Sequence, residues 1–445
     1  MQIPVLVTLP AQEPLRESAM AFREGRAPKM DIRHANIPKV LQLDERYPAV
    51  PIGSGRPTDR AAAHHPDRSE TFAVRAFIDA LDASKIPETA DGKPVFCDPR
   101  IAPFLTCGGT APVGDANDVR TKLNVQALKG KGLDGHGIAV AVMDTGINLA
   151  HLSAKLGGQA RIDVTNSWQT VGLTIPPGQH PVDHGTMCAF DILLAAPKAT
   201  LLDYPILSSN APGGSQMGGT LSVAVLAYAQ LIASWAVAFA PGGAAKYKAL
   251  VVSNSWGIFH PSWDFPAGHP GRYCDNPRHP FHLIISTLAS SGVDIVFAAG
   301  NCGKDCADGR CQARTKGAIM GASAHPEVLT LAGCDTIDKR VGYSSQGPSI
   351  AKMFQDKPDV TAYTHFLGSE AFGAGSPDSG TSAACPVAAG CVAALRTKVD
   401  WQTTPPKNLF DQFRASAKHS GAPGWNADYG FGIIDPVATA NSLGV

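Results

Sequence analysis

The stretch IAVAVMDTGI, residues 138–147, decides the fold. Its first six residues are apolar and run directly into Asp144, and a Thr-Gly turn follows. An apolar run without polar alternation is typical of a strand that is covered on both faces, as in a parallel sheet. On its own, Asp144 could simply end that strand before a tight turn. The carboxyl end of a parallel strand is also where α/β proteins place their sites, which makes Asp144 a candidate functional residue.

The chain beyond residue 116 repeats this pattern of apolar strands that alternate with helical stretches. We expect strands at 138–144, 199–207, 249–257, 293–301 and 328–334, and helices that begin at 184 and cover 219–240, 281–291 and 383–397. The alternation predicts an α/β fold with a mostly parallel sheet and helices on both faces. Ser255 and Asn301 join Asp144 at predicted strand ends, where a crevice is expected.

Residues 1–116 differ in pattern from residues 117–445, and we treat the two as separate domains. Short apolar pieces at 3–9 and 71–84 flank the polar stretch RPTDRAAAHHPDRSE at 56–70, which is typical of a loop or linker. The pattern predicts a small α+β domain in front of the α/β domain.

Composition excludes several classes of partner. The formal net charge of the 445-residue chain is zero, so neither nucleic acid nor a membrane surface is an expected partner. The longest uncharged apolar run, 219–240, contains Ser222, Gln230 and Ser234, and it favours a buried helix over a membrane span. The N-terminal residues lack a charged start before a long apolar core, so no secretory signal is recognised and a cytoplasmic location is expected.

The chain has ten cysteines. Without a recognised signal, most are expected to be thiols in a reducing compartment. Cys302, Cys306 and Cys311 cluster in NCGKDCADGRC, but no fourth ligand at zinc spacing lies nearby. The cluster therefore predicts a local disulfide or plain thiols, and no metal is expected.

Three further polar residues open or precede helices or strand turns. His184 opens a helix in DHGTMCAFDILLAA, Ser382 precedes one in GTSAACPVAAG, and Asn301 ends AAGN. Taken singly, His184 and Ser382 could each cap a helix, and Asn301 could form a turn. Together they fit a nucleophile that needs an adjacent base: Ser382 would attack, and His184 would take its proton. Asp144 would orient the imidazole, and Asn301 would donate to the oxyanion beside the Ser382 N–H at the helix start.

The chain order Asp, His, Ser is the order found in subtilisins. The chain resembles the subtilisin-like serine peptidases over about 117–436, and the motifs that carry the resemblance are GKGLDGHGIAVAVMDTGI, DHGTMCA, APKATLLDYPIL, SNSWG, VFAAGN, YSSQGP, GTSAACPVAAG and YGFGIIDPVATA. The resemblance implies peptide-bond hydrolysis through an acyl-enzyme, without a cofactor. It also implies two substrate-cleft walls, one formed by Ser255, Trp256 and Gly257 and the other by Ala299 and Gly300. An extended peptide would pair with the first wall as an added strand.

The resemblance implies roles for the rest of the chain as well. Residues 1–116 have the position of a propeptide that blocks the cleft, and an unrelated adaptor domain is the alternative. No stretch matches the calcium loops of the family. The sequence does not decide the oligomeric state.

Three alternatives stay open at this point. An aspartic peptidase could pair Asp144 of DTGI with Asp378 of DSGT, although that fold is all-β. A sedolisin also has a GTSA serine but uses a glutamate base, and His184 and Asn301 favour the subtilisin branch. A catalytically silent peptide-binding protein could keep the same scaffold.

Overall fold

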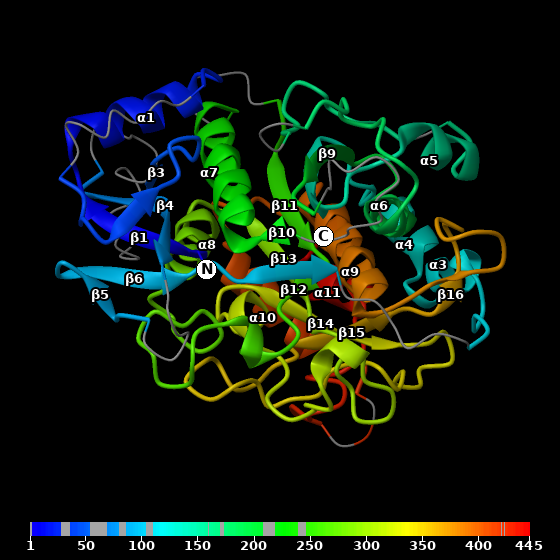
Figure 1. Ribbon diagram of the computed structural model, residues 1–445. Helices are drawn as coiled ribbons and strands as arrows, with labels where there is room; N and C mark the ends of the chain where they lie inside the picture. Colours follow the sequence, from blue (N-terminus) through cyan, green and yellow to red (C-terminus); the bar gives the residue numbers. More distant parts are fainter. Residues whose placement is uncertain are drawn as a thin grey trace. The chain divides into compact units, whose positions relative to one another are not determined.

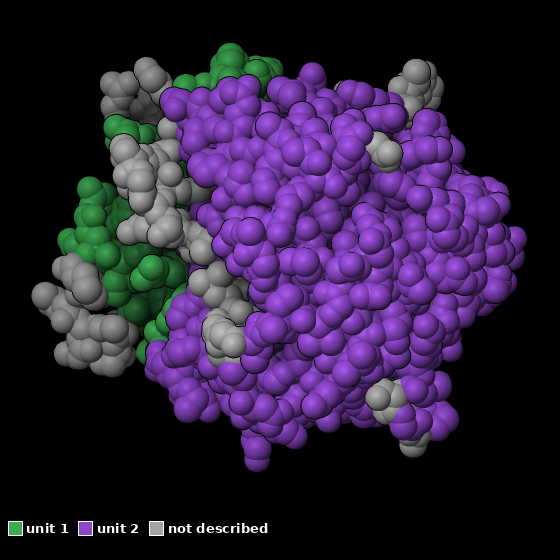
Figure 2. Space-filling model, turned by 90° about the vertical axis from the view of Figure 1, so that its right-hand side faces the viewer, with its two compact units in different colours: residues 1–100, 220–243, 261–291 green, residues 101–219, 244–260, 292–445 purple. Residues whose placement is uncertain are grey.

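The computed structural model describes residues 2–27, 36–53, 69–79, 86–103, 110–158, 160–169, 173–207, 219–238, 246–419, 421 and 423–445. The chain divides into two compact units, which Figure 2 colours separately. Unit 1 consists of Met1–Arg100, Thr220–Gly243 and Pro261–Ser291, and unit 2 of Ile101–Gly219, Ala244–His260 and Gly292–Val445. The units therefore do not follow a single boundary at residue 116.

Among its described residues, unit 1 contains an antiparallel sheet and three α-helices. Five strands have the order β2-β4-β1-β6-β5, and β3 also pairs with β4. Their bounds are β1 (Gln2–Pro10), β2 (Leu41–Leu43), β3 (Val50–Pro51), β4 (Thr71–Asp79), β5 (Thr89–Ala90) and β6 (Lys93–Cys97). Alternate residues of β1 and β4 point into one core, which Leu15 and Ala19 of α1 (Glu13–Arg23) join. This arrangement is an α+β fold.

The other two helices of unit 1 come from the middle of the chain. The apolar run predicted as a buried helix forms α7 (Leu221–Ala238), and α8 (Pro280–Ser290) follows a 3₁₀ turn, η3 (Pro261–Trp263). Tyr228 of α7 and Phe281 of α8 are both buried, with ring centroids 5.1 Å apart. The packing of these helices explains why their segments cluster together. None of the helices in the described residues is long and apolar enough to cross a membrane.

Unit 2 is built on a six-stranded parallel sheet in the order β15-β14-β13-β11-β8-β9 (Figure 1). The strands are β8 (Ile138–Asp144), β9 (Thr200–Pro205), β11 (Ala249–Asn254), β13 (Asp294–Ala298), β14 (Leu329–Cys334) and β15 (Val360–Tyr363). All five pairings are parallel. Each residue of β8 is buried, as the unbroken apolar run predicts. The predicted α/β class is confirmed.

Two long helices of unit 2 carry candidate residues, and both pack on the sheet. α9 (Thr381–Arg396) lies against β11, β13, β14 and β15, while α6 (His184–Ala195) lies against β8 and α9 (Figure 1). A Cβ on Gly390 would lie 2.3 Å from the carbonyl oxygen of Ile192, so the two helices cross in close contact at this glycine. The predicted helices at 219–240 and 281–291 belong to unit 1 instead.

The remaining elements lie wholly or partly in unit 2 and are shorter. They are β7 (Arg100–Pro103), α3 (Ala116–Lys122), α4 (Val125–Gly130), α5 (Leu149–Lys155), β10 (Gly219–Thr220), β12 (Trp256–Gly257), η4 (Gly309–Cys311), η5 (Gly321–Ala324), β16 (Phe366–Leu367), β17 (Pro377–Asp378), α10 (Pro406–Ser416) and α11 (Pro436–Ser442). β7 and β12 form part of a three-stranded sheet in the order β10-β7-β12, and β16 pairs with β17.

Candidate active site

Three candidate residues lie at the carboxyl ends of neighbouring strands. Asp144 is the last residue of β8, Ser255 follows β11, and Asn301 lies three residues beyond the end of β13. These strands are adjacent in the order β13-β11-β8, so their carboxyl ends meet at one edge of the sheet. The expectation that strand ends bring these residues to the same side follows from parallel pairing.

Asp144 and His184 are in direct contact. His184 Nδ1 lies 2.8 Å from one carboxylate oxygen of Asp144 and 3.0 Å from the other, and both side chains are buried. His184 is the first residue of α6, where the Asp183 side chain accepts its N–H. A Cβ on Gly185 would lie 2.5 Å from the carbonyl oxygen of Gly146. The glycine thus allows the start of α6 to approach the turn after Asp144.

Ser382 is the second residue of α9, in the first turn that leaves N–H groups without helical acceptors. Four residues later, Pro386 has no N–H, so the Ser382 carbonyl lacks its usual helical donor. The Ser255 hydroxyl donates to this carbonyl at 2.9 Å, and the Cys188 thiol of α6 approaches it at 3.5 Å. The Ser255 side chain therefore holds the first turn of α9 at Ser382.

Cys188 connects the candidate residues on α6 and α9. Its Sγ lies 3.6 Å from an Asp144 oxygen and 3.8 Å from His184 Nδ1. Burial, and the nearby charge of Asp144, raise the pKa of this thiol well above its ordinary value, so it stays neutral. Asp144, His184 and Cys188 also place metal-ligand atoms within 4.8 Å of one another. The contact between His184 Nδ1 and Asp144 has the length of a hydrogen bond.

The side chain of Asn301 has a fixed orientation. Its Oδ1 accepts the Thr381 N–H at 2.9 Å and the Thr381 hydroxyl at 3.0 Å, and the residue is fully buried. Because Oδ1 faces Thr381, the Nδ2 donor faces away from it. The Thr381 hydroxyl also accepts the Gly300 N–H at 3.0 Å. Sequence reasoning missed Thr381, although it stands directly before Ser382 in the GTS motif.

The structure does not join Ser382 to His184 by a hydrogen bond. The Ser382 hydroxyl donates to the Ser255 carbonyl at 3.2 Å. His184 Nε2 is buried and has no hydrogen-bond partner among the residues that the structure describes. In enzymes without bound substrate, hydrogen bonds between catalytic groups are often long or poorly aligned, and they tighten only when the substrate is bound.

The first predicted wall of the cleft is already paired with another part of the chain. β12 pairs antiparallel with β7, with Trp256 opposite Pro103 and Gly257 opposite Ala102. The Trp256 indole is fully buried, edge-on to Phe297 at a ring distance of 5.4 Å. Trp256 can therefore line a cleft through its backbone alone. In the second predicted wall, Ala299 is almost completely buried and Gly300 adopts a φ of 101°, which is open to glycine without strain.

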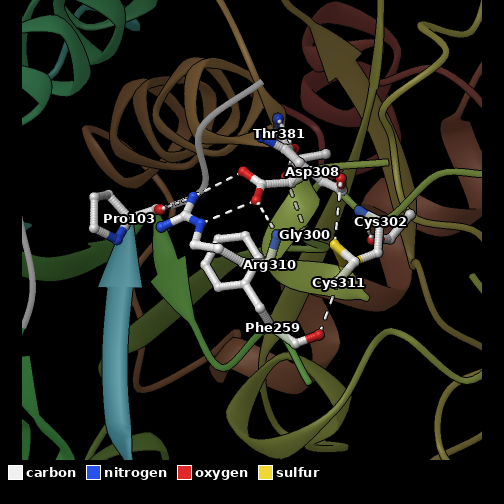
Figure 3. Close-up of a disulfide and its surroundings, with 10 residues drawn as sticks. Pro103, Phe259, Gly300, Cys302, Asp308, Arg310, Cys311 and Thr381 are labelled. Carbon is white, nitrogen blue, oxygen red and sulfur yellow. Dashed lines mark hydrogen bonds and ion pairs between the residues drawn. A yellow bond between two sulfur atoms is a disulfide. The ribbon is translucent and has the colours of Figure 1, made fainter. Parts of the chain in front are cut away.

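The loop after Asn301 contains a disulfide. Cys302 and Cys311 are joined, as the local-disulfide alternative predicted. Cys306 is disulfide-bonded as well, and six other cysteines of the described residues are buried thiols. Figure 3 shows the Cys302–Cys311 bond beside Arg310, whose guanidinium lies over the Phe259 ring at 3.7 Å. Sequence reasoning gave no role to Arg310.

Asp378, the second acid of the aspartic alternative, is bound elsewhere. It accepts the N–H of Ser369 at 2.6 Å and the Ser369 hydroxyl, while Asp144 is bound to His184. No N–H or O–H group of the described chain donates to either oxygen of the fully buried Asp191. The neighbouring acidic group is the Asp378 carboxyl. Burial and this neighbouring acid raise the pKa of Asp191 well above its ordinary value, and burial raises that of Asp378 to about 6.

Replacing Asp191 by asparagine is expected to flatten the dependence of stability on pH. Unfolded carboxyls ionise near pH 3.8, whereas this folded pair keeps its protons to about pH 6 and above. The stability contributed by the pair is therefore complete below pH 3.8, and it is lost as the pH rises through 6. The free energy of unfolding falls by about 1.4 kcal/mol per pH unit for each proton released. An asparagine side chain at this position cannot ionise, so it does not contribute this pH dependence.

The comparison is made by thermal unfolding between pH 4 and 8 in a Ser382→Ala background, which prevents self-digestion. We expect Asp191→Asn to unfold a few degrees higher than its parent at pH 8, with the gap closing towards pH 4. The exposed Asp356→Asn is the control and should follow its parent throughout. A gap that does not change with pH would show that Asp191 is not protonated in the folded protein.

Comparison with known proteins agrees with the parallel sheet of unit 2. Residues 135–432 match the model of the subtilase family. The chain belongs to this family.

Characterised relatives are distant. The chain is 25% identical over 355 residues to a calcium-dependent protease of Nostoc sp. (strain PCC 7120 / SAG 25.82 / UTEX 2576), an alignment that covers 71% of this chain and 48% of the relative. It is 23% identical over 328 residues to subtilisin of Bacillus pumilus, covering 72% of this chain and 97% of the relative. It is also 23% identical over 328 residues to subtilisin E of Bacillus subtilis (strain 168), covering 72% of this chain and 70% of the relative. The chain spans about half the length of the calcium-dependent protease.

Proposed function

We propose that this chain is a serine endopeptidase that hydrolyses peptide bonds through Asp144, His184 and Ser382. Membership of the subtilase family supports the activity. The single observation that carries the residue assignment is the pair of contacts between His184 Nδ1 and the Asp144 carboxylate, beside the first turn of α9. A buried carboxylate on Nδ1 leaves Nε2 as the nitrogen that can take and return a proton.

The reaction begins when the Ser382 hydroxyl turns from the Ser255 carbonyl towards His184 Nε2. Ser382 Oγ bonds to the substrate carbonyl carbon as its proton passes to Nε2, and Asp144 stabilises the resulting imidazolium. The imidazolium then protonates the amine as the peptide C–N bond breaks, which leaves an acyl-enzyme. Water attacks this ester by the same proton path and releases the acid.

Two donors are positioned for the negative oxygen of the intermediate. Asn301 Oδ1 is held by Thr381, which supports the assignment of Nδ2 as one donor. The Ser382 N–H, in the first turn of α9, is the other, and the positive end of the helix dipole favours charge at this place. Both donors are fixed before the substrate arrives, so little reorganisation accompanies the reaction.

The substrate is an extended peptide that adds a strand to β12. The antiparallel pairing of β12 with β7 supports this proposal, because it shows that the edge of β12 accepts an extended segment. By the same pairing, we propose that residues 1–116 act as a propeptide-like region, whose residues Ala102 and Pro103 fill the place of substrate. External peptides would gain access when β7 leaves.

Labelling with a fluorophosphonate probe, followed by peptide mapping and intact mass measurement, tests this function. We expect one label per folded chain, at Ser382, in wild type and in Asp378→Asn. Intact chains of 46.5 kDa that hydrolyse peptides at full rate would contradict a blocking role for residues 1–116.

A catalytically silent scaffold is the second candidate, favoured by one observation: the Ser382 hydroxyl donates to Ser255 and not to His184. Correctly folded protein that does not react with the probe would support it. Peptide hydrolysis by wild type without labelling, lost in a folded Asp378→Asn protein, would instead implicate the acid of the aspartic alternative.

A further inference from the structure

The chain supplies its own peptide strand for the edge of β12. Pro103 lies opposite Trp256 and Ala102 opposite Gly257, in an antiparallel register. An extended substrate on the same edge would present its backbone in the same way. Contacts to the backbone of Pro103 therefore indicate contacts that a substrate residue at this position would receive.

Arg310 makes such a contact from the loop after Asn301. Its guanidinium donates to the Pro103 carbonyl at 3.1 Å, as the dashed line in Figure 3 shows. A main-chain carbonyl is present in every peptide, so this hydrogen bond does not depend on the side chain at that position. It would hold the strand in register, whatever its sequence.

The guanidinium is held in place from two other sides. Its Nε and one terminal nitrogen donate to the two Asp308 oxygens at 3.0 and 2.8 Å, and its flat face covers the Phe259 ring. The Arg310 side chain is 27% exposed. Because Asp308 balances its charge, Arg310 suits a neutral carbonyl better than an anionic group.

The loop that carries Arg310 is fastened to the candidate oxyanion residue. The Asp308 N–H donates to the Asn301 carbonyl at 2.9 Å, and the Cys302–Cys311 disulfide closes the loop around this bond. Arg310 lies immediately before Cys311 in this closed loop. The spacing between the oxyanion donor and the guanidinium is therefore set by covalent and hydrogen bonds.

We infer that Arg310 is a substrate-binding residue, which donates a hydrogen bond to the main-chain carbonyl of the substrate residue that replaces Pro103 opposite Trp256. The inference rests on the proposed function. The bond forms with bound substrate and persists through the reaction, so its loss should raise KM more than it lowers kcat.

The test compares two substrates on full-length protein, incubated until its mass is constant. An N-acyl tetrapeptide amide carries the carbonyl in question, whereas p-nitrophenyl butyrate has no carbonyl besides the reacting one. We expect Arg310→Ala to lower kcat/KM for the peptide about tenfold, which is the effect of one charge-assisted hydrogen bond, and to leave the ester unchanged. Arg310→Lys should lower kcat/KM for the peptide nearly as much as Arg310→Ala, because one ammonium cannot bind Asp308 and the carbonyl in the same geometry.

Lys316→Ala is the matched control, because it removes the same charge from an exposed position six residues away. It should leave both rates unchanged. Equal losses on peptide and ester would mean that Arg310 acts through Asn301, and unchanged peptide kinetics would mean that no such bond forms; either result overturns the inference. Ester hydrolysis without peptide hydrolysis in wild type would show that β7 never leaves, and would overturn it too. Failure of wild type on both substrates, without probe labelling, would refute the proposed function itself.

Discussion

Ser382→Ala is expected to lower kcat for a peptide substrate by about 10⁶-fold, a magnitude taken from subtilisin, which belongs to the same family. The methyl group cannot form the acyl-enzyme, so the only catalysis left comes from binding and from the oxyanion donors. Those elements still accelerate hydrolysis over water by about 10³–10⁴-fold in subtilisin. The fold should persist, because the Ser382 carbonyl, not its hydroxyl, receives the bonds from Ser255 and Cys188.

The measurement is the initial rate of peptide hydrolysis, with circular dichroism to verify folding. Ser379→Ala is the control, since it makes the same substitution three residues earlier, outside the proposed machinery. It should keep near-normal activity. A Ser382→Ala protein that retains more than a hundredth of the wild-type rate, insensitive to fluorophosphonate, would rule out Ser382 as the nucleophile.

Asp144→Asn is expected to lower kcat by about 10⁴-fold near neutral pH. In the proposed mechanism, the contacts of 2.8 and 3.0 Å keep a proton on His184 Nδ1, so that Nε2 acts as the base. An asparagine amide can donate to Nδ1 instead, which would select the tautomer with its proton on Nε2. It also cannot stabilise the imidazolium. The side chain has nearly the same shape, so the loss should be electrostatic.

Asp183→Asn provides the matched comparison for Asp144→Asn. Asp183 is adjacent to the histidine and accepts its N–H as the cap of α6, a role that asparagine fills equally well. Its rate should remain within a few-fold of wild type. If both variants lost activity equally, the charge around α6, and not the contact with Nδ1, would explain the effect.

The parts of the structure that depend on local sequence were predictable. β8 has the bounds expected of residues 138–144, because an unbroken apolar run ending in a polar residue marks both ends of a buried strand. α7 begins within two residues of its prediction for a similar reason. β15 was missed because its four residues are too few for a periodic signal. Candidate residues at strand ends could be grouped, since parallel pairing places those ends together.

Contacts that depend on packing were not predictable. Asp191 lies two turns after His184 on α6, and nothing in its local sequence indicates that it meets Asp378. The SNSWG motif suggested a cleft wall, yet the Trp256 side chain is turned into the core against Phe297. Arg310 reaches Pro103 across 207 residues of sequence, a distance over which spacing carries no information. The same limit applies to the two units, which draw on interleaved segments of the chain.

The pairing of β7 with β12 has a consequence for how the protein would respond to concentration. If β12 binds substrate as proposed, a segment on the same chain would compete with external peptides at an effective concentration on the order of millimolar, which is independent of how much protein is present. Dilution alone therefore leaves β12 occupied. Cutting the chain after residue 103 would end this covalent connection. The occupancy of β12 would then depend on noncovalent contacts, including those that residues 1–100 make with residues 220–243 and 261–291 in unit 1.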